Sequence, residues 1–131
     1  MSENNSDFAE VLRISSLTPA HRLRKIRVAG RLQAYALEES IIVLEDDDLH
    51  LLVDISLCLS GQASYPWLRE RNTVVVAVGY LEVTDMILED DTEPVTTIIL
   101  HALLITERRE LDLRVWNAAI EQSEKRQTSQ A

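Results

Sequence analysis

The sequence predicts an all-β fold with helices: a five-stranded Greek-key barrel with a short helix between strands three and four and a C-terminal helix. Two long apolar runs predict it, residues 23–37 and 73–83, and each is interrupted once, by Gly30 and by Gly79. A glycine inside a strand usually marks a bulge or a sharp bend. A first strand bent at Gly30 can pair with a different strand at each end, and this is how a small barrel closes.

The first long run alternates apolar and polar residues on both sides of Gly30, which is typical of a half-buried strand. Residues 40–44 and 49–57 are shorter aliphatic runs, and the polar residues 45–48 between them predict a tight turn. These two runs therefore predict a hairpin.

Residues 65–71 predict a short helix, with Ser64 as its N-cap and Pro66 in the first turn, where a missing N–H does no harm. Residues 95–106 predict the last strand; it is apolar on both faces, so we expect it to be covered on both. Residues 111–125 predict the C-terminal helix. This order matches the oligonucleotide/oligosaccharide-binding (OB) barrel. The alternative is an SH3-like barrel, which lacks the helix at 65–71.

The chain is long enough for one domain, with 131 residues of which 46% are hydrophobic. We expect a single OB-fold domain over residues 18–125, a flexible N-terminal segment over 1–17 and a disordered tail over 126–131. Within the first segment, residues 8–14 predict either a short helical turn or an arm laid across the barrel. No apolar run approaches the ~20 residues that cross a membrane, and the polar, acidic start is not a secretory signal.

Charge favours a protein partner over nucleic acid. The chain has 13 Lys and Arg against 22 Asp and Glu, a net charge of −9, and only 5% aromatic residues. Phosphate contacts dominate nucleic-acid affinity, and stacking needs aromatic rings. The single cysteine, Cys58, excludes an internal disulfide and fits a reducing compartment. The chain has no phosphate loop, nucleophile motif or metal-ligand spacing, so we expect no enzyme, no cofactor and no metal.

The C-terminal helix is the strongest candidate for a binding site, because it carries an apolar stripe at helical spacing. The stripe consists of Leu113, Trp116, Ala119 and Ile120. Small Ala119 permits close helix approach, and tryptophan is enriched among interface anchors. We expect Leu111 and Val115 to face the barrel and Trp116 and Ile120 to face a partner. The alternative is that the stripe only covers an open end of the barrel.

A basic cluster surrounds the first strand and consists of His21, Arg22, Arg24, Lys25, Arg27 and Arg31. It could follow a single-stranded DNA backbone or pair with a partner's acidic residues. Arginine holds a carboxylate bidentately, so Arg27 is the candidate for a partner salt bridge. Tyr35 and Tyr80 are candidates for base stacking. The alternatives are a solvated strand face and partly buried barrel tyrosines.

Several short runs within this plan resemble the smallest (Ten) subunit of the telomeric CST complex, in its fungal form. They are Gly30-Arg31-Leu32 with Tyr35, Val78-Gly79-Tyr80-Leu81-Glu82, and the helical run 113–120, which ends in Ala119-Ile120. The resemblance covers roughly residues 23 to 125. The small subunit of replication protein A, or of a related genome-maintenance complex, shares the plan and is one alternative. A stand-alone ligand- or peptide-binding barrel is an alternative of another class.

The resemblance implies a nuclear protein at chromosome telomeres. Its barrel would pair with the Stn-type OB-fold subunit largely through C-terminal helices and join the larger CST subunit. The complex would protect single-stranded telomeric DNA, which this chain would reach mostly through its partners. Polymerase α–primase would be an indirect partner. The loops 45–48 and 88–94 are acidic, whereas a contact with DNA phosphates needs basic residues.

Overall fold

The structure is a computed structural model that describes residues 8–59, 65–86 and 95–130, without the side chains of 86, 95 and 127–130. The strands are β1 (Glu10–Val11), β2 (Lys25–Ala36), β3 (Ile41–Asp46), β4 (Leu49–Asp54), β5 (Val74–Met86) and β6 (Val95–Glu107). Short 3-10 turns are η2 (Ile14–Ser16), η3 (Pro19–His21) and η4 (Pro66–Arg69), and the helix is α1 (Leu113–Gln130). The N-cap expected at Ser64 lies outside the described residues.

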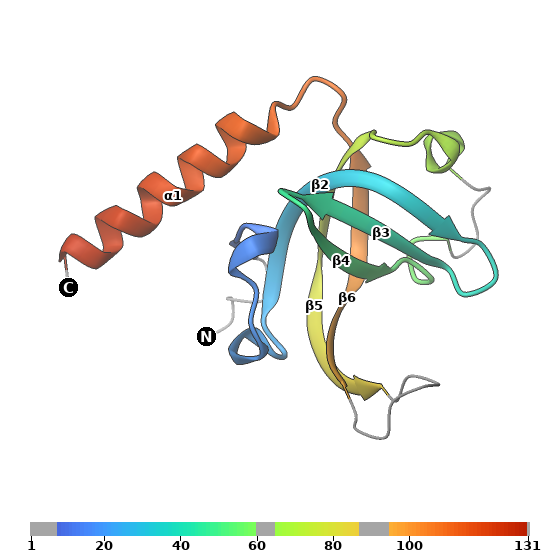
Figure 1. Ribbon diagram of the computed structural model, residues 1–131, viewed down its shortest axis with the longest axis horizontal. Coiled ribbons are helices and arrows are strands. Elements are labelled where there is room, and N and C mark those ends of the chain that lie inside the picture. Colours follow the sequence, from blue (N-terminus) through green and yellow to red (C-terminus); the bar gives the residue numbers. More distant parts are fainter. Residues whose placement is uncertain (1–7, 60–64, 87–94, 131) are drawn as a thin grey trace.

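Five of the strands close a barrel in the order β2-β3-β4-β6-β5, with β5 pairing back onto β2 (Figure 1). β2 pairs with β5 over residues 25–31 and with β3 over residues 31–36, so it bends near Gly30 and serves both neighbours. β4 and β6 are parallel, and the other barrel pairs are antiparallel. Since η4 lies between β4 and β5, the order confirms the predicted OB barrel over the SH3-like one.

Both strand glycines are required by close packing. A Cβ atom on Gly79 would lie 2.0 Å from the carbonyl oxygen of His101 and 2.7 Å from the Cα of Ala102. On Gly30 it would lie 2.9 Å from Ile14 Cδ1. A register shift falls between Val78 and Gly79, so a β-bulge brings the two backbones together at Gly79. The predicted bends are therefore places where another part of the chain comes too close for a side chain.

The turn between β3 and β4 is shorter than predicted. Asp47 and Asp48 form it, with φ of 53° and 64°, while Glu45 and Asp46 belong to β3. Two-residue hairpin turns need positive φ at both central residues, and aspartate tolerates this conformation. The hairpin itself is confirmed, with Ile41 opposite Asp54 and Asp46 opposite Leu49.

Residues 10–17 lie along the barrel, so the flexible segment expected over residues 1–17 is wrong for these residues. Glu10 and Val11 pair in parallel with β2. Leu12 and Ile14 are 7% and 6% exposed and belong to the core cluster that also fills the barrel. We call residues 8–17 the arm. The arm lies across the barrel because its apolar side chains are buried there, beside β2.

The last strand is not covered on both faces. Leu100, Ala102 and Ile105 point into the core, whereas Leu103 is 46% and Leu104 55% exposed. The bulge opposite Gly79 explains this result, because it adds one residue to β6 at this point. The expectation of full cover over residues 95–106 is therefore wrong at Leu103 and Leu104.

α1 begins where Asp112 Oδ1 accepts hydrogen bonds from the backbone N–H groups of Arg114, at 2.9 Å, and Val115, at 3.4 Å. This carboxylate caps the helix. The helix continues to Gln130, so the tail expected to be disordered over 126–131 is helical up to that residue. Figure 1 shows α1 projecting away from the barrel past η2.

A histidine bridges two carboxylates on the outside of the parallel seam between β4 and β6. His101 Nδ1 lies 3.3 Å from Asp54 Oδ2, and Nε2 lies 2.8 Å from Glu82 Oε1. Burial alone would raise the pKa of the Asp54 carboxyl, but hydrogen bonds from Ser56 and the proximity of His101 outweigh it and lower this pKa. The ionised form of Asp54 therefore stabilises the seam.

We expect Asp54→Asn to lower the midpoint of thermal unfolding at neutral pH by about 1–3 °C. A carboxyl group with a lowered pKa in the folded chain stabilises it above the unfolded pKa, and this contribution is lost as pH falls through the folded pKa. The variant should lose part of its acid dependence, measurable from melting curves recorded between neutral and strongly acidic pH. Equal acid dependence in both proteins would contradict the assignment.

Candidate functional site

A groove with a volume of about 730 Å³ lies between α1 and the arm. Trp116, Ala119 and Ile120 line it from the helix, and Val11 and Arg27 line it from β1 and β2. Four of the five residues predicted to bind a partner therefore meet in one place. We call this the α1 groove.

Leu113, the fifth predicted residue, lies outside the groove. It is 2% exposed and packs with Ala29 and Val74 under the first turn of the helix. Trp116 is partly buried against the same cluster, and Ile120 is 8% exposed. The stripe therefore covers part of the barrel, as one of the sequence alternatives proposed.

The expected orientation holds for Leu111, which packs against the barrel, but is wrong for the helix from Val115 on. Val115 was predicted to face the barrel but is 65% exposed, whereas Trp116 and Ile120 face the barrel side. The cause is the phase of the helix, which is set by burial of Leu113 against the outer surface of β2 and β5. Positions 116 and 120 follow Leu113 on the same side at helical spacing. Only Ala119 of the predicted stripe is fully open to solvent.

Polar contacts that sequence reasoning missed hold α1 to the barrel. Arg13 on the arm pairs with Glu121 at 3.2 Å and with Glu124 at 2.7 Å. The Asn117 amide donates a hydrogen bond of 2.7 Å to Asp46 at the end of β3. These partners lie far apart in sequence and no local motif links them. A single sequence offers no signal that pairs them.

Two side-chain polar atoms of the helix stay without a partner in the described part of the chain, Trp116 Nε1 and Asn117 Oδ1. The indole Nε1 of Trp116 is buried and has no acceptor there. A buried donor without an acceptor costs free energy.

The basic cluster does not form one patch. Arg24 pairs with Glu10 at 3.4 Å, and Arg27 lines the α1 groove. Arg31 lines a separate hollow of about 540 Å³ beside Asp46 and Asn117. Lys25, at the start of β2, lies opposite Tyr80. The length and bend of β2 distribute these cations over different parts of the barrel.

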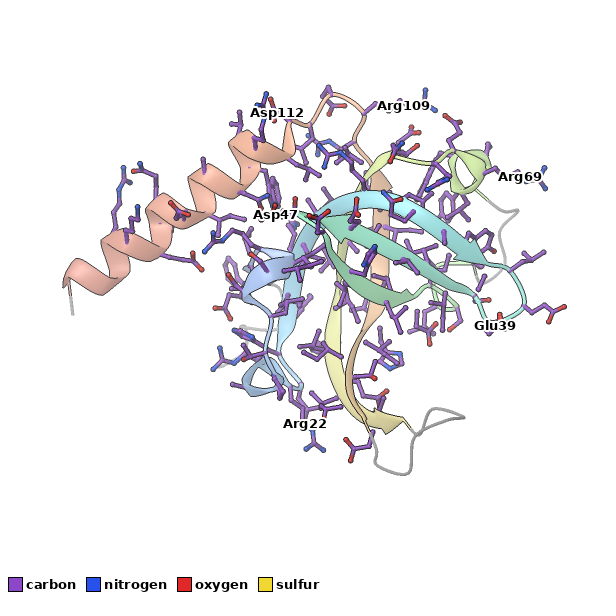
Figure 2. All side chains as sticks on the ribbon, in the orientation of Figure 1. Arg22, Glu39, Asp47, Arg69, Arg109 and Asp112 are labelled. Carbon is purple, nitrogen blue, oxygen red and sulfur yellow. The ribbon has the colours of Figure 1, made fainter. Side chains whose placement is uncertain are left out.

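Arg22 lies at the opposite end of the molecule from Asp112, where α1 begins (Figure 2). Lys25 begins β2, whereas Arg31 and Tyr35 lie in its second half, so the predicted nucleic-acid residues are spread along that strand. Among them, Arg22 and Arg24 are exposed, whereas Lys25 and Arg31 are half-buried.

The two candidate stacking residues are also separated. Tyr35 is half-buried against the core and lies opposite Ile42 on β3. Tyr80 is 40% exposed and lies opposite Lys25, at the other end of β2. Base stacking on successive aromatic rings needs neighbouring platforms, and this pair does not supply them. Neither β3 nor β4 contains an aromatic residue.

The described residues show no arrangement for metal chemistry or a membrane span. No group of three or more His, Cys, Asp or Glu among them is placed to hold a metal ion. No helix in the described ranges is long and apolar enough to cross a bilayer. Burial raises the pKa of the Cys58 thiol, and its Sγ lies 3.6 Å from the carbonyl oxygen of Ala102. A raised pKa keeps the thiol protonated and unreactive.

Solved structures from S. pombe have a similar fold. A chain of the Stn1–ten1 complex matches with a TM-score of 0.65 and 19% identity, over 92% of this chain and 95% of that one. The telomere capping protein Ten1 matches with a TM-score of 0.64 and 18% identity, over 90% and 99%. An OBody bound to hen egg-white lysozyme matches with a TM-score of 0.53 and 17% identity, over 76% and 95%. No curated protein gives a significant sequence match.

The family comparison covers nearly the whole chain. The family model for the telomere-capping CST complex subunit of the Ten1 type matches residues 8–130. That range includes the arm, all five barrel strands and α1, so the match extends over both walls of the α1 groove. The chain therefore belongs to the Ten1 family of telomere-capping CST complex subunits.

Proposed function

We propose that this chain pairs with an Stn-type OB-fold subunit through the α1 groove and so joins a larger CST subunit at nuclear telomeres. The resulting complex protects single-stranded telomeric DNA and acts with polymerase α–primase, which this chain meets indirectly. Family membership and the S. pombe Stn1–ten1 complex support the choice of partner. The role is structural, with no catalysis and no cofactor.

The observation that carries this proposal is the convergence of an apolar wall and an exposed cation, Arg27, in one groove. Ala119 is exposed and small, so a partner element can approach the helix closely. Trp116 offers a large apolar surface beside it, and tryptophan and arginine are the side chains that most often dominate binding energy. Val11 is 40% exposed on the opposite wall and would be covered on binding.

Arg27 supplies the charge. It is exposed and makes no hydrogen bond or ion pair within the part of the chain that the structure describes. In a chain with 22 acidic residues, an exposed arginine with no acidic partner among the described residues is available for one from outside. A carboxylate on the Stn-type subunit would bind it through two hydrogen bonds.

DNA contacts are expected to come mostly from the partners. The cations along β2 are distributed over different parts of the barrel, Tyr35 and Tyr80 lie at opposite ends of β2, and the net charge is −9. Because phosphate neutralisation dominates nucleic-acid affinity, the isolated chain should bind single-stranded telomeric DNA weakly at moderate salt. A titration that gave nanomolar affinity would contradict this part of the proposal.

Arg27→Glu tests the groove directly. We expect the affinity for the Stn-type subunit to fall by about tenfold or more, because a favourable ion pair becomes a repulsive one. The melting temperature should not change, since Arg27 makes no ion pair within the described chain. Calorimetric titration of the partner at two salt concentrations measures the effect and its electrostatic origin.

The matched control is Arg114→Glu, which makes the same charge change on α1 at a side chain that is 92% exposed and does not line the groove. Its affinity should stay near that of the wild-type chain. If both variants lost affinity for the Stn-type subunit equally, the cause would be net charge, and the assignment of Arg27 to the interface would be contradicted.

A further inference from the structure

The outward side chains of β3, β4, β6 and β5 form a second surface, which we call the acidic face. Its aliphatic members are Ile41, Val43, Leu52 and Ile99, and its carboxylates are Asp54, Glu45 and Glu82. The strand register places Val43, Leu52, Ile99 and Glu82 in one row across the four strands. A second row contains Ile41, Asp54, His101 and Tyr80. The four aliphatic side chains are each half-buried.

OB barrels bind oligonucleotides on the face formed by their second and third strands, which are β3 and β4 here. In this chain that face lacks the chemistry for nucleic acid. The ring nitrogens of His101 both face carboxylates, on Asp54 and Glu82, and His50 lies 3.6 Å from Glu45. The carboxylates would repel phosphates, and the rings of His50 and His101 on this face are held against carboxylates.

The acidic face adjoins a hollow. The paired positions of β4 and β6 begin at Leu52 and Ile99, and next to them a hollow of about 410 Å³ opens between the two strands. Ile14, Leu17 and Ile98 are among its apolar lining residues, and His50 and Thr96 are among its polar ones. The hollow is large enough for one bulky apolar side chain.

We propose that the acidic face binds an extended segment of another protein whose inward-facing positions are aliphatic in the middle and Lys or Arg at both ends. Charge complementarity selects this occupant: Asp54, Glu45 and Glu82 border the aliphatic row, so a segment with cations on its edges and aliphatic residues between them matches both. A large apolar residue of the segment enters the hollow between β4 and β6. Specificity comes from this pocket and from the placement of the carboxylates.

This surface extends the proposed function. The acidic face and its hollow share no lining residue with the α1 groove. A chain that is already paired through α1 would therefore keep a second docking site for a basic protein segment.

The test uses the full chain, isotope-labelled for NMR, and a short peptide in which every second residue reads Lys, Leu, Phe, Leu and Lys, with Ser at the positions between. We expect the peptide to shift the amide signals of Val43, Leu52 and Ile99, and to bind more weakly as salt rises. The same peptide with Glu in place of Lys, and a single-stranded oligonucleotide of similar length, should leave these signals unchanged.

Glu82→Lys should reduce peptide affinity by about fivefold or more, because it reverses a charge beside the aliphatic row. Glu110→Lys is the matched control, since its side chain is 71% exposed and lies on neither surface, and it should bind as the wild-type chain does. If Glu82→Lys disturbs the fold, Glu82→Gln keeps an oxygen for His101 while removing the charge, and a smaller loss of the same kind is expected.

Three results would overturn the proposal: peptide shifts confined to the α1 groove, an oligonucleotide that shifts the acidic face, or equal losses in the Glu82 and Glu110 variants. The peptide experiment can fail while pairing through the α1 groove is confirmed, and the reverse is also possible. Arg27→Glu should weaken pairing with the Stn-type subunit and leave peptide binding intact, and Glu82→Lys should do the reverse.

Discussion

Trp116→Ala should abolish co-purification of this chain with its Stn-type subunit while the barrel stays folded. Tryptophan anchors at the centre of an interface contribute about 2–4 kcal/mol, which lowers affinity by roughly 30- to 1000-fold when the side chain is removed. The helix keeps its other attachments, because Leu113 remains buried and Arg13 still pairs with Glu121 and Glu124. Recovery of the partner from co-expressing cells, together with a melting curve, measures both properties.

Two further variants separate partner binding from helix attachment. Ala119→Arg places a large side chain in the groove at an exposed position, so it should block pairing with no loss of stability. Val115→Ala truncates a side chain that is 65% exposed and lies outside the groove, and it should leave pairing intact. Undiminished recovery with both Trp116→Ala and Ala119→Arg would refute the role of the groove.

Gly79→Ala should unfold most of the protein. The added methyl group would lie 2.0 Å from the His101 carbonyl oxygen and 2.7 Å from the Ala102 Cα. Both are backbone atoms, so β5 and β6 would have to separate along the longest strand pairing of the barrel. The expected loss exceeds about 3 kcal/mol, a large fraction of the stability of a typical small domain. Chemical denaturation followed by circular dichroism measures it.

Gly30→Ala is the matched comparison, with the same added atom in the other bent strand. Its nearest contact is the end of a flexible side chain, Ile14 Cδ1 at 2.9 Å, although Leu44 Cβ lies close at 3.0 Å. Because Ile14 can move, we expect a smaller loss of about 1–2 kcal/mol. The explanation of Gly79 fails if both variants unfold at the same denaturant concentration.

Local patterns predicted the barrel well because each of its strands has a recognisable pattern of apolar residues in the sequence. Alternation across residues 23–37 located β2 to within two residues at each end, and the apolar runs with one glycine each located the strands that bend. The aspartates between β3 and β4 signalled the hairpin. Each of these signals depends only on residues that are close together in the sequence, so a single sequence is enough to read it.

The missed features depend on contacts between distant residues. The sequence left open whether residues 8–14 form a helical turn or an arm across the barrel, and the arm is what the structure shows. The sequence could not decide between them, because the site that receives Leu12 and Ile14 is built by later strands. The phase of α1 follows from burial of Leu113 against Ala29 and Val74. A periodic stripe shows that one side of a helix is apolar, but it does not say whether that side meets the same chain or another.

Leu103 and Leu104 show that the same limit applies to a strand, because the sequence pattern did not predict that they are exposed. An uninterrupted apolar run predicts burial on both faces, but a bulge opposite Gly79 turns two neighbouring leucines outward. The bulge arises from the fit between two strands, which the run itself does not encode.

Photo-crosslinking from the α1 groove tests the central claim most directly. A benzoylphenylalanine at position 119, which is exposed on the groove wall, should crosslink to a co-expressed Stn-type subunit. The same probe at position 82, on the acidic face, should not reach that subunit. A crosslink from position 82 with none from position 119 would contradict the account, because the partner would then bind the barrel away from α1.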